Sequence, residues 1–151
     1  MFKSILSVMF VASVCLGADA MPMHKMGMSQ MDMNPDDERQ SLGIKGTMQG
    51  AHQLSNMREH LAAVSEIVQL MNTGKYDEAS KVASEKLGLT LEKNTMCGSF
   101  NNKSFEEMGL RFHKSADDLA QTLKTKDQKK TMVSLEKVLN ECVMCHSTFK
   151  Q

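Results

Sequence analysis

Cys142, Cys145 and His146 are the residues whose types and spacing point most directly to chemistry. Their order, Cys-x-x-Cys-His, is the attachment motif of c-type haem. Residues three apart on a helix share a face, so both thiols can reach the two vinyl groups along one edge of a porphyrin. His146 follows Cys142 by one turn and can coordinate iron from the proximal side. The sequence therefore predicts one covalent haem c, with His146 as the axial iron ligand.

Two other kinds of site use the same residue types. A structural zinc site needs four ligands, usually from two paired motifs, and no second pair accompanies this one, although Cys97 and a distant histidine could be recruited. A thiol–disulfide oxidoreductase carries Cys-x-x-Cys at a strand-to-helix junction in an α/β chain. Here the motif follows a helical pattern, which favours haem. Of the three cysteines that follow residue 20, Cys97 lies outside the motif. It is predicted to be buried, with an intermolecular disulfide or an approach to the haem pocket as the alternatives.

The elements that must position this motif are predicted to be helices. A first helix from about residue 46 is predicted to end at Asn72-Thr73-Gly74, with Gly74 as its cap. Its apolar positions step by three or four residues along one face. They are Leu54, Met57, Leu61, Val64, Val68 and Met71. A shorter helix follows and ends at Gly88; its shared face is Ala79, Val82, Ala83 and Leu87.

Residues 89–103 are predicted to form a loop, after which two further helices follow. The third helix starts at the capping box Ser104-Phe105-Glu106-Glu107. Its apolar face is Phe105, Met108, Phe112, Ala116, Leu119 and Leu123, and that of the last helix is Leu135, Val138, Leu139, Cys142, His146 and Phe149. No segment alternates with period two. The expected fold is all-α, an antiparallel four-helix bundle with C-terminal haem attachment.

The N-terminal residues predict export. Lys3 precedes a short apolar run, and Ala18-Asp19-Ala20 is typical of a cleavage site, so residues 1–20 are interpreted as a signal peptide leading to the periplasm. Residues 21–45 are expected to be a flexible tail, and residues 46–151 the haem domain. No other apolar run predicts membrane insertion. With 18 basic and 18 acidic residues, no strong field favours a nucleic acid partner.

The tail is rich in methionine. Thioethers are soft ligands that select Cu(I), and an exported chain can meet that ion. The residues concerned are Met21, Met23, His24, Met26 and Met28. Copper handling by this segment is therefore an alternative function, and a linker in which methionine has no metal role is the simpler interpretation.

The ending Cys142-Val143-Met144-Cys145-His146-Ser147-Thr148-Phe149-Lys150 resembles that of the class II c-type cytochromes, the cytochrome c-prime and cytochrome c-556 family. The resemblance implies a helical bundle whose distal haem residue comes from the first helix. It places Met57 at that position, with His60 as the next candidate. A ligating methionine there implies electron transfer, and a non-ligating residue implies five-coordinate iron that binds NO or CO. Family members often dimerise through their first two helices, so a homodimer is compatible with the resemblance.

The chain shows no catalytic acid, base or nucleophile in a recognisable arrangement, so it is not expected to be an enzyme. The predicted function is electron transfer by a periplasmic mono-haem protein that meets its redox protein partners transiently. His52 and His113 are expected to be surface or hydrogen-bonded core residues. Arg58, Lys114 and Lys150 could pair with haem propionates, although solvated surface charges are the commoner case.

Overall fold

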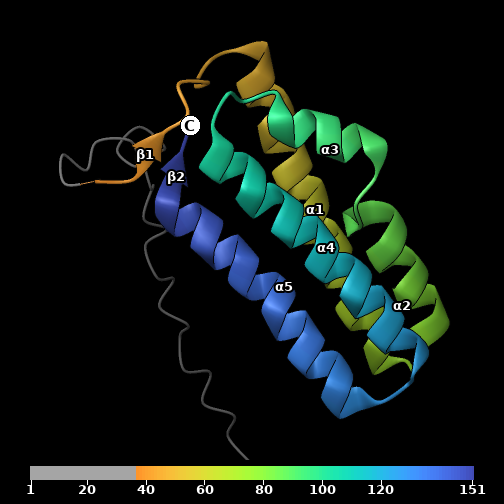
Figure 1. Cartoon of the computed structure of the whole chain (residues 1–151). Helices are drawn as coiled ribbons and strands as arrows, with labels where there is room; N and C mark the ends of the chain where they lie inside the picture. Colours follow the sequence, from red (N-terminus) through yellow and green to blue (C-terminus); the bar gives the residue numbers. More distant parts are fainter. Residues whose placement is uncertain (1–36) are drawn as a thin grey trace, which may run out of the picture. The chain divides into compact units, whose positions relative to one another are not determined.

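The computed structural model describes residues 37–151, and helices fill most of that range (Figure 1). The helices are α1 (Met48–Asn72), α2 (Tyr76–Val82), the π-helix η1 (Ala83–Leu87), α3 (Leu91–Gly98), α4 (Lys103–Lys124) and α5 (Gln128–Thr148). Two short strands, β1 (Gln40–Ser41) and β2 (Phe149–Lys150), flank them. The all-α prediction is confirmed for this part of the chain. The predicted signal peptide, residues 1–20, lies outside the described residues.

Local capping interactions explain where helix α1 begins and ends. The Thr47 hydroxyl accepts a hydrogen bond from the Gly50 amide at 3.0 Å, which satisfies one of the free amides at the helix start. At the other end Gly74 adopts a φ of 74°, a left-handed conformation that glycine reaches without steric cost. The predicted end of this helix at Asn72-Thr73-Gly74 is confirmed.

The predicted apolar face of α1 is only partly right. Leu61 is 72% exposed and Leu54 is 45% exposed, whereas Ala63 and Ile67 are buried in the core. Met57 and Val64 are half-buried. The inward face is therefore rotated by about one residue from the prediction. The reason is that Leu54 and Leu61 line a cavity instead of packing against another helix.

Residues 89–103 were predicted to be a loop, and this prediction is wrong, because they contain α3. The Thr90 hydroxyl caps that helix by accepting from the Lys93 amide at 3.2 Å. The Lys93 ammonium in turn donates to the carbonyls of Lys86 and Gly88, both at 2.9 Å, and of Glu85 at 3.3 Å. These bonds satisfy carbonyls at the end of η1 that have no partner within the helix.

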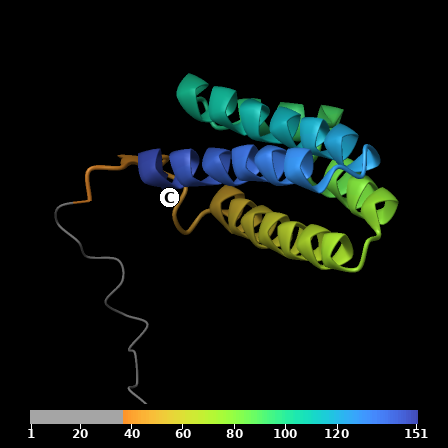
Figure 2. The ribbon, with the colours of Figure 1, turned by 90° about the horizontal axis from the view of Figure 1, so that it is seen from below.

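Helices α4 and α5 form the longest packed pair. Asn102, rather than the predicted Ser104, caps α4, and its side-chain oxygen accepts from the Phe105 amide at 3.0 Å. After a short turn α5 returns alongside α4 (Figure 2). The predicted face of α4 is confirmed, with the single exception that Met108 is half-buried.

The core lies where α1, α2, η1, α4 and α5 meet. Its buried side chains include Ile67, Leu87, Leu119, Leu123 and Val138. One polar contact crosses it, since the buried Ser80 hydroxyl donates to the Ala120 carbonyl at 2.7 Å and ties α2 to α4. Small residues such as Ala79 and Ala116 let these helices approach closely.

Residues 37–45, assigned by the sequence to the end of the flexible tail, contact the C-terminal residues. Strand β1 pairs in parallel with β2, with Gln40 opposite Phe149. The Leu42 amide donates to the Lys150 carbonyl at 2.8 Å, and the Ile44 side chain is buried. This segment therefore holds the beginning of the described chain against the end of α5.

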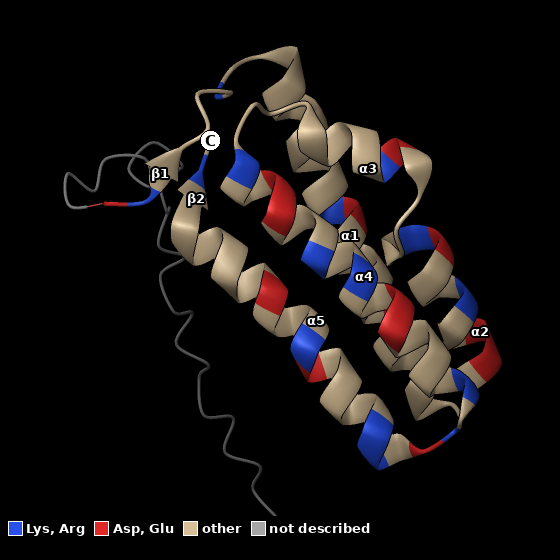
Figure 3. Cartoon of the chain, in the orientation of Figure 1, with Lys and Arg blue, Asp and Glu red and all other residues tan. Residues whose placement is uncertain are grey.

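Basic and acidic residues both occur along α2 and α4 (Figure 3). Their ion pairs are exposed, as in the contact of Lys103 with Glu107 at 3.9 Å, and contribute little to stability. Between residues 37 and 151, no helix combines the length and the apolar character that crossing a bilayer requires.

Candidate functional site

A cavity of about 530 Å³ opens between the helices and is the best candidate for a binding site. Helix α1 contributes Gln53, Leu54, Met57, Arg58, His60, Leu61 and Val64; α3 and the residue beyond it contribute Met96, Cys97 and Phe100; α4 contributes Phe105, Met108, Gly109, Phe112 and His113; α5 contributes Leu139, Glu141, Cys142, Cys145 and His146. This volume falls within the range typical of ligand and cofactor pockets.

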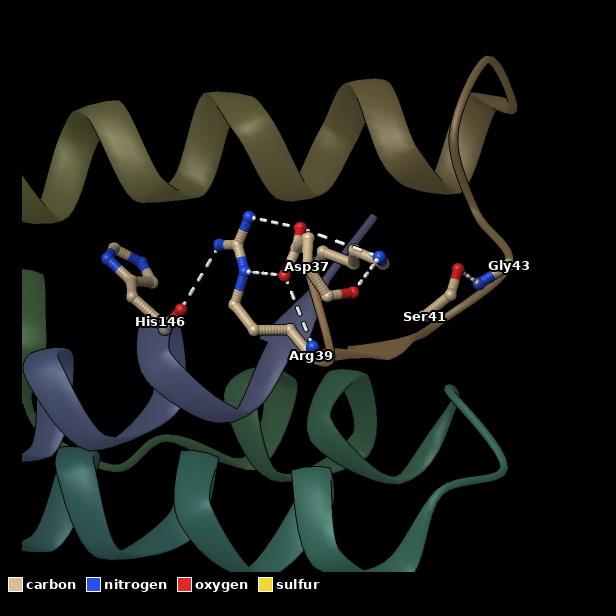
Figure 4. A network of polar contacts seen from close by, with 6 residues as sticks. Asp37, Arg39, Ser41, Gly43 and His146 are labelled. Atoms are coloured by element: carbon tan, nitrogen blue, oxygen red, sulfur yellow. Dashed lines mark hydrogen bonds and ion pairs between the residues drawn. The ribbon is translucent and has the colours of Figure 1, made fainter. Parts of the chain in front are cut away.

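The predicted haem-attachment motif, Cys142, Cys145 and His146, lines this cavity. Cys142 and Cys145 are half-buried, and His146 is exposed, near the end of α5. Figure 4 shows the His146 imidazole pointing from α5 toward α1. Met57, the predicted distal residue, lines the same cavity from α1. The structure thus brings together the four residues that the sequence analysis assigned to one site, although 85 residues separate Met57 from Cys142 in the sequence.

Both motif thiols are held in their protonated form. Burial, followed by the nearby Cys142 and Cys97 thiols, raises the pKa of Cys145 to about 11. Burial also raises the pKa of Cys142, whose thiol donates to the Val138 carbonyl at 3.4 Å. A nucleophilic cysteine of a thiol–disulfide oxidoreductase has a lowered pKa instead. The site therefore lacks the electrostatic environment of that class.

Cys97 is the third thiol on this wall and is buried as predicted, with 5% exposure. Gly109 makes its position possible, because a Cβ at residue 109 would come within 2.7 Å of the Cys97 sulfur. The sequence analysis assigned no role to Gly109. A glycine within an amphipathic helical pattern is a signal of close approach, and it could have identified this contact.

Much of the remaining lining is apolar, and it includes one buried unpaired carbonyl oxygen. The apolar lining comes from Phe105, Met108 and Phe112 of α4 and from Leu61 and Val64 of α1. Gln53 is 8% exposed, and among residues 37–151 its side-chain oxygen is one of two buried side-chain atoms that lack a hydrogen-bond partner. A buried unpaired acceptor costs free energy unless a bound group donates to it.

Two histidines also line the cavity. The His113 Nδ1 bonds to the Leu87 carbonyl at 2.7 Å, so this nitrogen carries the proton. His113 is 2% exposed, which fits the prediction of a hydrogen-bonded core residue. His60 is half-buried, and its ring centroid lies 4.9 Å from that of Phe112 and 5.6 Å from that of His113. His52 is exposed on α1.

A network of polar contacts joins the N-terminal segment to the end of α5 beside the motif (Figure 4). Arg39 donates to the His146 carbonyl at 3.2 Å and pairs with Asp37 at 2.9 Å. Lys150 donates to the Asp37 carbonyl at 2.7 Å and lies 3.5 Å from its carboxylate. Hydrogen bonds from Arg39 hold the pKa of Asp37 well below its usual range. Lys150, a candidate for the haem surroundings, is therefore engaged by the N-terminal segment.

The residues fit a covalently attached haem. Two protonated thiols three residues apart, an imidazole beside them and a largely apolar cavity are the protein groups that such a cofactor needs. Within residues 37–151 no three His, Cys, Asp or Glu side chains are grouped to hold a metal ion. Haem iron takes only its axial ligands from the protein, so a haem site does not require three such side chains in one group.

The methionine-rich segment with Met21, Met23, His24, Met26 and Met28 lies outside the described residues. The chain matches no family model, no curated protein and no solved structure.

Proposed function

We propose that this chain is a mono-haem c-type cytochrome that carries electrons. The observation that supports this most strongly is one cavity lined by Cys142, Cys145 and His146 of α5 and by Met57 of α1. Two independent observations support this site: the local spacing of the motif, and a cavity lined by helices that are distant in the sequence. We also propose that α1, α2 with η1, α4 and α5 are an antiparallel four-helix bundle of the class II c-type cytochromes.

Different residues of the cavity would contact different parts of the haem. The thiols of Cys142 and Cys145 would hold the haem covalently through two thioether links, and the His146 imidazole would bind its iron. The apolar side chains of α1 and α4 exclude water from the cavity and thereby tune the reduction potential. Gln53 offers an acceptor for a polar group of the occupant. When bound, haem supplies a one-electron couple between ferric and ferrous iron.

Electron exchange with partners requires that one side of the site be accessible. His146 is exposed at the end of α5, and Leu54 and Leu61 are exposed at the rim of the cavity from α1. Such an exposed edge suits a redox partner protein that binds through a small, transient interface. Export to the periplasm through residues 1–20 belongs to the same proposal.

Attachment is tested by expressing the full chain in cells that can attach haem c. The intact protein should gain the mass of one haem that resists acid extraction. Cys142→Ser should lose one thioether link, and the double change at Cys142 and Cys145 should abolish attachment. Cys97→Ser is the matched control, because this thiol lines the same cavity outside the motif; it should retain the haem. Protein without covalent haem from competent cells would refute the proposal.

A further inference from the structure

The cavity wall holds an imidazole without a hydrogen-bond partner. Among residues 37–151 no hydrogen bond engages either ring nitrogen of His60, which meets its neighbours only through ring contacts and electrostatic interactions. Neither nitrogen is fully enclosed, because the buried side-chain atoms without a partner among residues 37–151 are Gln53 Oε1 and Thr131 Oγ1. The His60 imidazole therefore lines the cavity with nitrogens that a bound group can reach.

The surroundings of His60 fix its ring. Its centroid is 4.9 Å from the Phe112 centroid with the two planes tilted by 32°, and 5.6 Å from the His113 centroid with the planes nearly perpendicular. His113 is itself fixed by the bond from Nδ1 to the Leu87 carbonyl. Burial, followed by the neighbouring His113, lowers the pKa of His60 to about 4, so its ring is neutral near pH 7 and has a lone pair to offer.

Met57 differs from His60 in what its side chain requires. A thioether packs in an apolar wall as a hydrophobic group and needs no partner. Met57 and His60 are three residues apart on α1, so both project toward the cavity from adjacent turns. Only the imidazole gains a partner that it otherwise lacks. The resemblance placed Met57 first and His60 second. Leu61, which belongs to the predicted inward face, is 72% exposed, whereas His60 is half-buried.

We propose that His60, rather than Met57, supplies the second axial ligand of the haem iron. The inference rests on the proposed function, because it needs a haem held at Cys142, Cys145 and His146. Two imidazoles then bind the iron from α5 and α1. Methionine ligation raises the potential of cytochromes c, so His60 ligation gives a lower potential than ligation by Met57.

The test uses the intact holoprotein. Electron paramagnetic resonance and near-infrared magnetic circular dichroism of the ferric form distinguish two axial imidazoles from one imidazole and one thioether. The unmodified protein should give the signature of two imidazoles. This measurement needs no variant, so it decides the question even if a substitution at His60 prevents folding. A histidine–methionine signature, or high-spin iron, would overturn the inference.

A matched pair of variants locates the ligand. His60→Leu should convert the iron to high spin and allow the ferrous form to bind carbon monoxide at concentrations that leave the unmodified protein unchanged. Met57→Leu should keep the iron low-spin and unreactive toward carbon monoxide. The reverse pattern would assign the ligand to Met57 and reject His60. Absence of any covalently bound haem is a different failure, since it would reject the proposed function together with this inference.

Discussion

The guanidinium of Arg39 donates a hydrogen bond to the backbone carbonyl of His146, which lies 107 residues further along the chain. Carbonyls in the last turn of a helix have no partner within the helix, so this bond satisfies one of them. The same guanidinium forms a paired contact with the Asp37 carboxylate. The N-terminal segment thereby fixes the backbone of the predicted iron ligand.

Replacing Arg39 by alanine should loosen this attachment. We expect faster hydrogen exchange at the Leu42 amide, which bonds to the Lys150 carbonyl, because local opening will separate β1 from β2. Arg111→Ala is the control, since Arg111 pairs with Glu141 elsewhere on α5. Exchange measured by mass spectrometry or NMR checks this, and equal rates at Leu42 in both variants would contradict it.

Gly109→Ala should destabilise the fold, although alanine favours a helix. A Cβ at this position would meet the Cys97 sulfur at 2.7 Å, and such overpacking costs about 1–3 kcal/mol. Urea unfolding should show the loss, and a second change, Cys97→Ala, should restore it by removing the sulfur.

Gly98→Ala serves as the matched substitution for Gly109→Ala. Its Cβ would lie 3.4 Å from the Glu106 carboxylate, at the far end of a flexible side chain. We expect a small change in the free energy of unfolding for this variant. If the two glycine variants lose equal stability, close approach to Cys97 does not explain the requirement at residue 109.

Ser80→Ala should weaken the packing of α2 on α4. The buried hydroxyl donates to the Ala120 carbonyl at 2.7 Å, and its loss should lower the free energy of unfolding by about 1 kcal/mol. Ser84→Ala removes an exposed bond to the Lys81 carbonyl and should change stability little. Denaturant unfolding of both variants provides the comparison; an equal effect would count against the buried bond.

Alkylation of the haem-free chain should depend steeply on pH at Cys145. The thiolate reacts, and a pKa raised from 9.0 to about 11 lowers its fraction about 100-fold at neutral pH. The rate should therefore keep rising through pH 9 and level off only near pH 11. Peptide mass spectrometry after timed alkylation gives this profile. A plateau below pH 9 would show that the thiol is not desolvated as described.

Local signals predicted the helix ends well and the helix faces less well. Gly74 correctly marked the end of α1, because cap chemistry depends on neighbouring residues alone. Helix α3 was missed because its sequence offers few apolar positions, and Leu91 is 83% exposed. Its single clear signal is the cap at Thr90.

The candidate site was predicted in part. The spacing of Cys142, Cys145 and His146 identified the motif, and their position on one cavity wall agrees with it. The apolar periodicity predicted an inward face of α1 that is rotated by about one residue from the observed face. The reason is that Leu54 and Leu61 line the cavity and are not part of the packed core. The contact of Arg39 with His146 joins distant segments, and no local pattern contains that information.

The cavity is assembled from residues between Gln53 and His146, so only the folded chain presents its wall. Whatever fills it binds the folded state in preference to the unfolded state and shifts the folding equilibrium by mass action. For a freely exchanging ligand, that shift fades on dilution. A covalently tethered occupant keeps a constant effective concentration beside its wall, so the stability that it confers is the same in a dilute compartment as in a crowded one.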